Sequence, residues 1–200
     1  VVVRLSLIDV GLLAEELAGE GRRIASNIHG RGVFVRFVES AAEAPGTAAL
    51  VDELLTDGAA VLCCHKFGFE VALAVLSHGL KRHRAVIVEC LFANIQRFAR
   101  HRFASQVLEL ALAHEAAVGG GELSSELLRC SRTLAKLACH CFGVRVIQRL
   151  LTVPTVRDRV LAHLRGAQPQ IMKDRYGARL LQECEEESVI LHPAGVCGGA

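Results

Sequence analysis

An internal repeat constrains the fold of this chain more than any other feature of its sequence. One short pattern occurs five times in the chain. It consists of a Gly or Ala, two variable residues, two apolar residues, two more variable residues and two mostly apolar ones. The copies are spaced by 38, 36, 39 and 34 residues and begin at Gly30, Gly68, Ala104, Gly143 and Gly177. For the first copy a start at Gly32 is the alternative, but it would put Arg36 and Glu39 at apolar positions, so the pattern favours Gly30. A period near 36 indicates a solenoid, because one unit cannot bury its own apolar face.

The spacing of the apolar residues indicates that the repeats are helical. In each copy the apolar pairs lie three to four residues apart and share one helix face, while the variable residues share the opposite edge. Further amphipathic stretches predict outer helices near residues 12–18, 48–55, 84–92 and 156–164. There is no Trp, one Tyr and only four Pro, which favours packed helices over a β-sandwich. The sequence therefore predicts an all-α solenoid, with one domain over residues 1–187 and an irregular tail over 188–200.

The charges are unevenly distributed along the chain. Residues 1–60 carry five basic and nine acidic groups, residues 61–182 carry eighteen and eight, and residues 183–200 carry four acids. A strongly basic middle suits a polyanionic partner, although a solvated helix face is the alternative interpretation. No apolar run reaches the roughly 18 residues that a membrane span needs. The start of the chain has no secretory signal pattern, so we expect no membrane contact.

The cysteines and the catalytic motifs argue against a metal site and an enzyme. Eight cysteines stand at positions 63, 64, 90, 130, 139, 141, 184 and 197, and we expect them to be reduced, since the chain has an apolar core of its own. Cys139-His140-Cys141 could suggest a metal, yet no second pair follows at the spacing of a structural zinc site. No phosphate-binding loop, hydrolase triad pattern or metalloprotease motif occurs. We therefore expect no metal, no cofactor and no catalysis.

Several segments in a fixed order resemble the Pumilio (PUF) family of RNA-binding repeat proteins. The run from His101 to Glu109, HRFASQVLE, is similar to the penultimate PUF repeat, and residues 65–68, HKFG, to the opening of the repeat before it. Residues 141–148, CFGVRVIQ, resemble the final repeat, and residues 173–177, KDRYG, the capping half-repeat. The resemblance covers about residues 10–187. It implies a right-handed, crescent-shaped solenoid of three-helix, armadillo-like repeats, of which this chain is the C-terminal part.

The resemblance also implies how RNA bases would be read. In the family each repeat binds one base, through side chains four apart on its inner helix and a neighbour that stacks. Ser105 and Glu109 would then read guanine, since a carboxylate and a hydroxyl can accept its N–H groups, with Gln106 in the stacking place. On the next unit Arg145 would stack, and Gln148 with Val144 would face uracil or adenine. Val144 departs from the usual Asn or Cys, and the implied sequence is 5′-(U or A)-G-N.

The remaining units lack such side chains. Phe69, Glu70 and Leu73 offer no complementary pair, and the first unit, with Gly32 and Val35, keeps only one cation, so we expect neither repeat to read a base. Phosphate or weak contacts are expected from Arg31, Lys66, Arg102, Arg179 and Gln182. A histidine shortly before the small residue recurs in three units, which indicates a repeated structural role rather than catalysis; these are His65, His101 and His140.

The sequence thus supports one main hypothesis and one competitor. The main hypothesis is a monomeric, cytoplasmic or nucleolar protein that binds single-stranded RNA, in mRNA 3′ untranslated regions by family resemblance, and regulates mRNA after transcription, with protein co-regulators on the convex face. The competitor is a degenerate PUF-like or armadillo/HEAT-like scaffold that binds structured nucleic acid or a protein without reading bases. Surface charge separates them: RNA binding predicts that the Lys and Arg of residues 61–182 gather on the concave face, and a peptide scaffold predicts an apolar or acidic groove.

Overall fold

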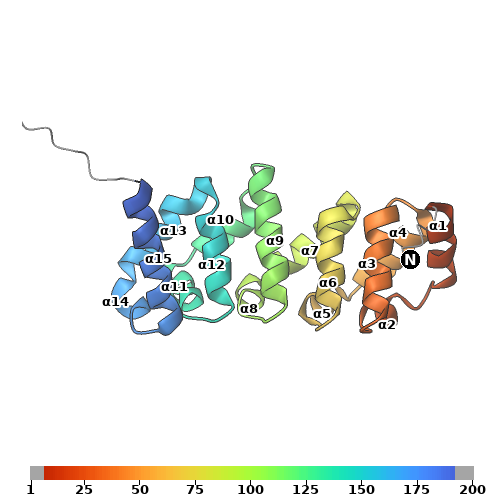
Figure 1. Ribbon diagram of the computed structural model, residues 1–200, viewed down its shortest axis with the longest axis horizontal. Coiled ribbons are helices and arrows are strands. Elements are labelled where there is room, and N and C mark those ends of the chain that lie inside the picture. Colours follow the sequence, from red (N-terminus) through yellow and green to blue (C-terminus); the bar gives the residue numbers. More distant parts are fainter. Residues whose placement is uncertain (1–6, 192–200) are drawn as a thin grey trace, which may run out of the picture.

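The computed structural model describes residues 7–191, which form one array of stacked helices without a strand (Figure 1). Five inner helices lie along one face: α3 (Gly30–Ala41), α6 (Gly68–His78), α9 (Ala104–Ala117), α12 (Gly143–Leu151) and α15 (Arg175–Leu191). Five outer helices lie behind them: α1 (Leu7–Glu16), α4 (Pro45–Leu55), α7 (Lys81–Ala93), α10 (Glu122–Leu128) and α13 (Pro154–Gly166). Five short helices precede the inner ones: α2 (Gly21–Ala25), α5 (Ala59–Cys64), α8 (Ile95–Phe98), α11 (Ser131–Ala138) and α14 (Gln168–Ile171).

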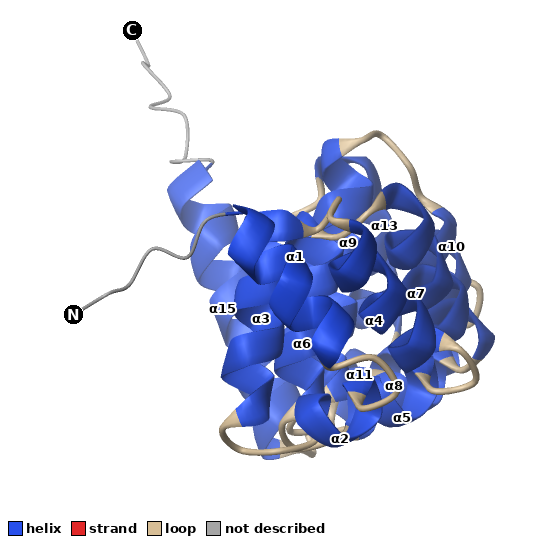
Figure 2. Ribbon diagram, turned by 90° about the vertical axis from the view of Figure 1, so that its right-hand side faces the viewer, coloured by secondary structure: helices blue, strands red, loops and turns tan. Residues whose placement is uncertain are grey.

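The view along the array separates these three sets. Figure 2 shows inner helices on one side, outer helices on the other and the short helices along the lower edge. Neighbouring inner helices contact one another in the order α3, α6, α9, α12 and α15. The predicted all-α solenoid of three-helix repeats is therefore confirmed. The third helix of each repeat was implied by the PUF resemblance, but its position was not predicted, because segments of four to eight residues are too short for helical periodicity to be recognised.

The small residue of each repeat lies where a short helix approaches the inner helix most closely. A Cβ atom added to Gly30 would lie 2.5 Å from the carbonyl oxygen of Ile24, and one added to Gly143 would lie 2.6 Å from that of Leu137. Gly32, in contrast, has no atom within 4 Å of the added Cβ position. The register that begins the first repeat at Gly30 is thus confirmed, and the repeated Gly or Ala has a steric cause.

A capping contact also recurs before every inner helix. The side chain of the residue three places before the small one accepts two hydrogen bonds. The donors are the backbone N–H groups of the second and third residues after it, the third being the small residue itself. The acceptors and their two N···acceptor distances are Asn27 Oδ1 (2.8 and 3.1 Å), His65 Nδ1 (both 3.2 Å), His101 Nδ1 (both 3.3 Å), His140 Nδ1 (3.2 and 3.3 Å) and Asp174 Oδ1 (2.8 and 3.2 Å). Such bonds satisfy N–H groups that a helix start leaves open. The expected structural role of the three histidines is confirmed, and it requires their Nδ1 atoms to be unprotonated.

The glycine-rich connection after α9 is more ordered than a plain flexible turn. Gly119 has a φ of +72°, which ends the helix in the left-handed region that glycine tolerates. The Glu115 carboxylate then accepts hydrogen bonds from the backbone N–H groups of Leu123 and Ser124, at 2.7 and 3.1 Å, and from the Ser124 hydroxyl at 2.6 Å. Glu115 therefore caps α10 and fixes the longest spacing between repeats.

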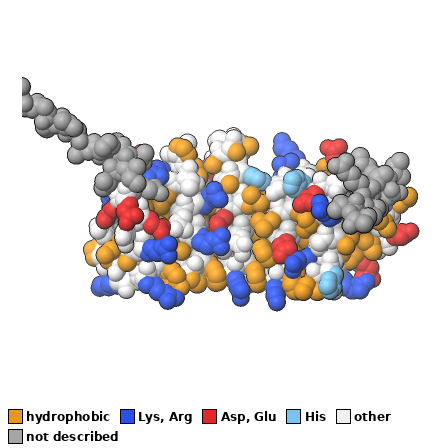
Figure 3. Space-filling model, viewed as in Figure 1, with side chains coloured by type: hydrophobic (Ala, Val, Ile, Leu, Met, Phe, Trp, Pro, Cys, Tyr) orange, Lys and Arg blue, Asp and Glu red, His pale blue; other side chains and the backbone are white. Residues whose placement is uncertain are grey.

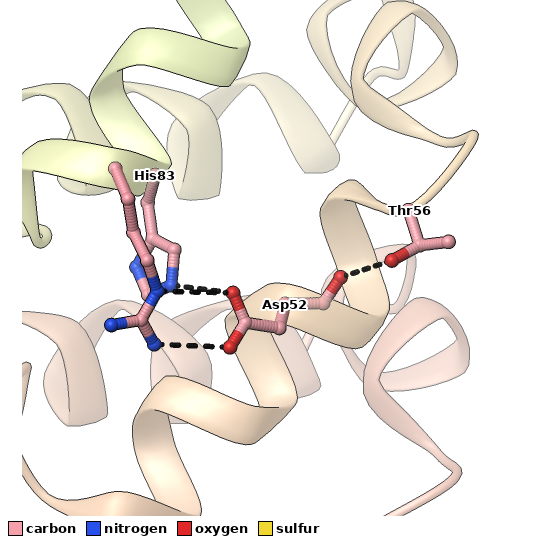
Figure 4. Close-up of polar contacts among 4 residues, drawn as sticks. Asp52, Thr56 and His83 are labelled. Atoms are coloured by element: carbon pink, nitrogen blue, oxygen red, sulfur yellow. Dashed lines mark hydrogen bonds and ion pairs between the residues drawn. The ribbon is translucent and has the colours of Figure 1, made fainter.

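A polar contact joins the outer helices α4 and α7 (Figure 4). Asp52 on α4 accepts hydrogen bonds from the Arg82 guanidinium at 3.0 Å and from the His83 Nε2 at 2.9 Å. The bond from Arg82 and, more weakly, the one from His83 lower the pKa of Asp52 against the opposing effect of desolvation. Burial lowers the pKa of His83, so a neutral imidazole that donates from Nε2 satisfies both groups.

The apolar core runs without interruption from α1 to α15. Large side chains such as Phe34, Leu76, Leu112 and Leu134 are at most 1% exposed. The last helix continues to Leu191, beyond the boundary at 187 that was predicted for the domain, and the rest of the predicted tail, residues 192–200, lies outside the described residues. Within residues 7–191 no helix has the length and apolarity to span a membrane, and the seven cysteines there are free thiols.

Candidate nucleic-acid interface

The two polar sets of side chains predicted to read bases lie on adjacent inner helices. Ser105, Gln106 and Glu109 belong to α9, and Val144, Arg145 and Gln148 belong to α12, which packs against α9. The two sets meet at one ion pair, in which the Arg145 Nε lies 3.4 Å from the Glu109 Oε1. The Arg145 side chain is 52% exposed and that of Glu109 only 14%, so the cation lies toward the surface and the carboxylate beneath it.

Two polar atoms of α9 have no hydrogen-bond partner. The Ser105 side chain is fully buried and its Oγ bonds to nothing, and the buried Glu109 Oε1 also lacks a hydrogen bond. Leaving such an atom unsatisfied costs about 1–3 kcal/mol. Among the described residues only Thr47 Oγ1 shares this condition. The site predicted to bind guanine therefore contains two of the three unsatisfied buried side-chain atoms in this part of the chain.

The electrostatic setting of Glu109 is mixed. Burial raises the pKa of Glu109, while the positive charges of Arg145 and Arg149 act in the opposite direction. Because burial is the largest influence, the carboxylate is poorly solvated rather than neutralised by its ion pair. A partner that donates N–H groups to it would supply the missing hydrogen bonds.

The other predicted residues of this half are engaged with neighbours. The Gln148 amide donates to the Glu183 Oε2 at 2.9 Å, and the other oxygen of Glu183 pairs with Arg179 at 2.9 Å. Gln106 donates to the backbone oxygen of Arg102 at 3.3 Å, Gln182 donates to Glu186 at 3.0 Å, and Val144 is half-buried. Glu183 was missed as a site residue because it follows the last repeat pattern directly and reads, in sequence, as the first residue of an acidic tail.

The inner face has a different character over α3 and α6. Arg31 pairs with Glu70 at 2.8 Å and lies 5.0 Å from the centre of the Phe67 ring. Phe69 stacks on Phe103 of the next repeat, with ring centres 5.2 Å apart. Arg31 is thus held by a carboxylate and a ring rather than presented freely. The triplet positions of these two repeats are therefore occupied by contacts between repeats.

The basic side chains do not gather on the inner helices, contrary to the distribution expected for RNA binding. Of the eighteen Lys and Arg in residues 61–182, four belong to these helices: Arg145, Arg149, Arg179 and, as the first residue of α15, Arg175. Figure 3 shows instead Lys and Arg along the lower edge of this face. The residue two places before the small one stacks there on the ring that follows it: Lys66 over Phe67 at 5.2 Å, Arg102 over Phe103 at 5.4 Å and Arg175 over Tyr176 at 4.5 Å. The inner face is therefore neither strongly basic nor an acidic groove.

Comparison with known protein families finds a match in the C-terminal part of the chain. The family described as Pumilio-family RNA binding repeat matches residues 134–163 and 169–184, which contain most of α11 to α13 and the first part of α15. No curated protein matches the sequence. The family match thus covers the last repeat and the cap. The preceding repeats stack on these in the same three-helix arrangement.

Solved structures extend the likeness over the whole array. A double mutant of the Puf4 RNA-binding domain bound to a Cox17 RNA 3′ UTR sequence is similar at a TM-score of 0.79 and 17% identity, over 98% of this chain and 65% of that one. Puf4 bound to an HO endonuclease RNA sequence gives 0.77 and 17%, over 89% and 56%. The PUM-HD domain of S. pombe Puf1 in complex with RNA gives 0.75 and 17%, over 92% and 47%. The chain therefore has the fold of these domains and spans about half to two thirds of their length.

Proposed function

We propose that this chain, a protein of Pumilio-type repeats, binds single-stranded RNA across its inner helices and selects a guanine with α9. The observation that carries the proposal is the pair of unsatisfied acceptors, Ser105 Oγ and Glu109 Oε1, one helical turn apart on the same helix. Guanine offers N–H donors on its Watson–Crick edge, and a carboxylate oxygen that lacks a hydrogen bond is suited to accept them. Binding would supply hydrogen bonds to both atoms, of which Glu109 Oε1 now has only the 3.4 Å ion pair with Arg145.

The neighbouring side chains define how the base would enter. Gln106 and Arg145 occupy corresponding positions on α9 and α12. A base inserted between them would stack on the planar guanidinium of Arg145. Arg145 is half exposed and its contact with Glu109 is long, so it can turn from the carboxylate to the base. Access to Ser105 needs the side chains that bury it to move as well. Gln148 would exchange its bond with Glu183 for one with uracil or adenine.

The wider role follows from the same proposal. The Puf4 and Puf3 domains of similar fold are bound to 3′ UTR recognition sequences, which supports an mRNA 3′ UTR as the target class here. A chain that reads one or two bases needs additional contacts for a useful affinity, from further repeats, from protein co-regulators or from the RNA backbone. We infer a non-enzymatic, cytoplasmic role in post-transcriptional regulation.

The test is equilibrium binding to short RNAs that differ in one base. The chain should bind an RNA containing UGU more tightly than one containing UAU, by about 5- to 150-fold if the discrimination is 1–3 kcal/mol, as for other bidentate base contacts. A Ser105→Ala/Glu109→Ala variant with an unchanged melting temperature should bind both RNAs equally. Equal affinity of the unaltered chain for the two RNAs would overturn base selection by α9, and a binding constant independent of salt would remove the phosphate contribution.

A further inference from the structure

A second surface lies on the layer of short helices, apart from the residues proposed to read bases. Eight exposed cations come from these helices and from the turns that lead into the inner ones: Lys66, Arg97, Arg100, Arg102, Arg132, Lys136, Lys173 and Arg175. The four segments that contain them, 59–67, 95–103, 130–142 and 168–176, hold one acid, Asp174, whose Oδ1 caps α15. Among the side chains that the structure describes, which exclude those of residues 7–11, 131 and 187–191, no carboxylate forms an ion pair with any of the eight. We call this surface the basic edge.

The basic edge contains a hollow between α8 and α11. The hollow has a volume of about 80 Å³, and Gln96, Arg100, Arg132, Thr133 and Lys136 contribute to its lining. Its three cations come from two successive repeats and no carboxylate lines it. Three positive charges that face one small space repel one another unless an anion lies between them.

Two further observations indicate that the hollow favours negative charge. Cys130 precedes α11 and also lines the hollow, and hydrogen bonds from the backbone and side chain of Thr133, then from the backbone of Arg132, lower the pKa of its thiol. Arg100 also helps, after burial, to lower the pKa of His140, so its charge extends toward the next inner helix. The hollow thus has an excess of positive charge and N–H donors.

The first repeat provides an internal contrast. Its corresponding segment, residues 20–29, contains Arg22 and Arg23, but Arg23 pairs with Glu20 and Arg22 donates to the backbone oxygen of Thr56. Of these two cations Arg23 is paired with a carboxylate, whereas no cation of the basic edge has a described carboxylate partner; Arg100 donates only to the backbone oxygen of Gln96, at 3.2 Å, and Arg175 to the Tyr176 hydroxyl. The unpaired charge is therefore concentrated in the repeats that follow α4.

We propose that the basic edge, centred on the hollow between α8 and α11, binds the phosphate backbone of the RNA that flanks the bases read on the inner helices. This inference rests on the proposed function. It is favoured over binding of an unrelated anion because α8 leads directly into α9 and α11 into α12, the two helices with the candidate base-reading residues. The flank of an RNA held there passes close to the hollow.

The contacts on the basic edge are independent of base sequence. Phosphates are bound by charge and release their counterions, so such contacts appear as salt dependence rather than as base preference. The aromatic rings at this edge, Phe67, Phe103 and Tyr176, already stack on their own cations, which leaves them unsuited to stacking with bases.

The experiment compares a short and a long RNA. One is a pentanucleotide containing UGU, and the other is the same sequence extended by uridines on both sides to twenty nucleotides. The edge variant is Arg100→Gln/Arg132→Gln/Lys136→Gln. The control variant, Arg84→Gln/Arg159→Gln/Arg165→Gln, removes the same charge from exposed positions of the outer helices α7 and α13.

The unaltered chain and the control variant should bind the long RNA more tightly than the short one. In the edge variant this gain should fall about tenfold, and the slope of log K against log salt for the long RNA should become shallower by about 2, as expected for three lost contacts to single-stranded RNA. The preference for UGU over UAU in the short RNA should remain, since that preference tests the proposed function separately. An unchanged gain in the edge variant, or an equal loss in the control variant, would refute the basic edge.

Discussion

The repeats built on α3 and α6 and those built on α9 and α12 share a scaffold but differ on the inner face. All four have a small residue close to a short helix, a cap three residues before it and buried apolar residues at the same positions. The variable positions differ: Arg31 and Phe69 are used in contacts between repeats, whereas Ser105 and Glu109 each have a buried polar atom without a hydrogen bond. Stacking of the repeats therefore constrains the small, capping and buried apolar positions, whereas recognition constrains the variable positions. The variable positions can differ between repeats without loss of the fold.

The largest effect should come from the shared positions and should be equal in both halves. Leu76 and Leu112 hold the ninth place of their repeats and are 1% and 0% exposed. Leu76→Ala and Leu112→Ala should each lower the free energy of unfolding by about 2–5 kcal/mol. Chemical denaturation measures this, and Val33→Ala, at an exposed site, is the control. A large loss at Leu112 with none at Leu76 would mean that the halves are not stabilised alike.

Transfer of the α9 triplet to α6 should give α6 the ability to select a guanine. Phe69→Ser/Glu70→Gln/Leu73→Glu gives α6 the side chains of α9. The order 5′-(U or A)-G-N implied by the PUF resemblance puts the base after the guanine at α6, so this variant should prefer UGG over UGA by about 1–3 kcal/mol, whereas the unaltered chain should bind both alike. It should also be less stable, since Phe69 stacks on Phe103. A variant that stays folded but gains no preference would show that the triplet alone does not determine reading.

Caps that differ chemically between repeats should differ in their response to pH. His140→Ala should lower the free energy of unfolding by about 1 kcal/mol near neutral pH. Burial, then Arg100, lowers the pKa of His140 in the folded chain, so its contribution is complete above about pH 6.5 and is lost as the pH falls toward the folded value. His140→Asp should restore stability, because Asp174 caps α15 in this way. Melting temperatures at pH 7.5 and 5.5 measure this, and a response identical to the unaltered chain would contradict the capping role.

The smallest effect is expected where α12 meets the last helix. Glu183→Ala removes the acceptor of Gln148 and the partner of Arg179 at a partly exposed site, so stability should change by at most about 1 kcal/mol. If Gln148 reads a base, its release should tighten binding of UGU relative to CGU slightly, which competition binding can detect. Weaker binding in this variant would indicate that Glu183 holds Gln148 in its productive position.

Much of the scaffold could be predicted because its causes are local. Helical spacing of apolar residues and the small residue that recurs at Gly30, Gly68 and Gly143 defined the inner helices and their register. The common cap was only partly recognised, since Asn27 and Asp174 use other chemical groups than the histidines for the same hydrogen bonds.

The site was less accessible to sequence analysis because it depends on contacts between repeats. The positions of Ser105 and Glu109 on α9 followed from the pattern, but the burial of Ser105 and the pairing of Glu109 with Arg145 are properties of the assembled array. The concentration of basic residues along the short helices was likewise hidden, because those helices are too short to be recognised from periodicity.

One thermodynamic cycle measures whether the Glu109 carboxylate reads a guanine. Affinities of the unaltered chain and of Glu109→Gln are measured for UGU and UAU RNAs. Burial already raises the pKa of Glu109, so the neutral amide should leave stability unchanged or slightly higher. Glu109→Gln should abolish the preference for UGU by weakening that complex alone, with a coupling of about 1–3 kcal/mol. Equal changes for both RNAs, with no coupling, would contradict it.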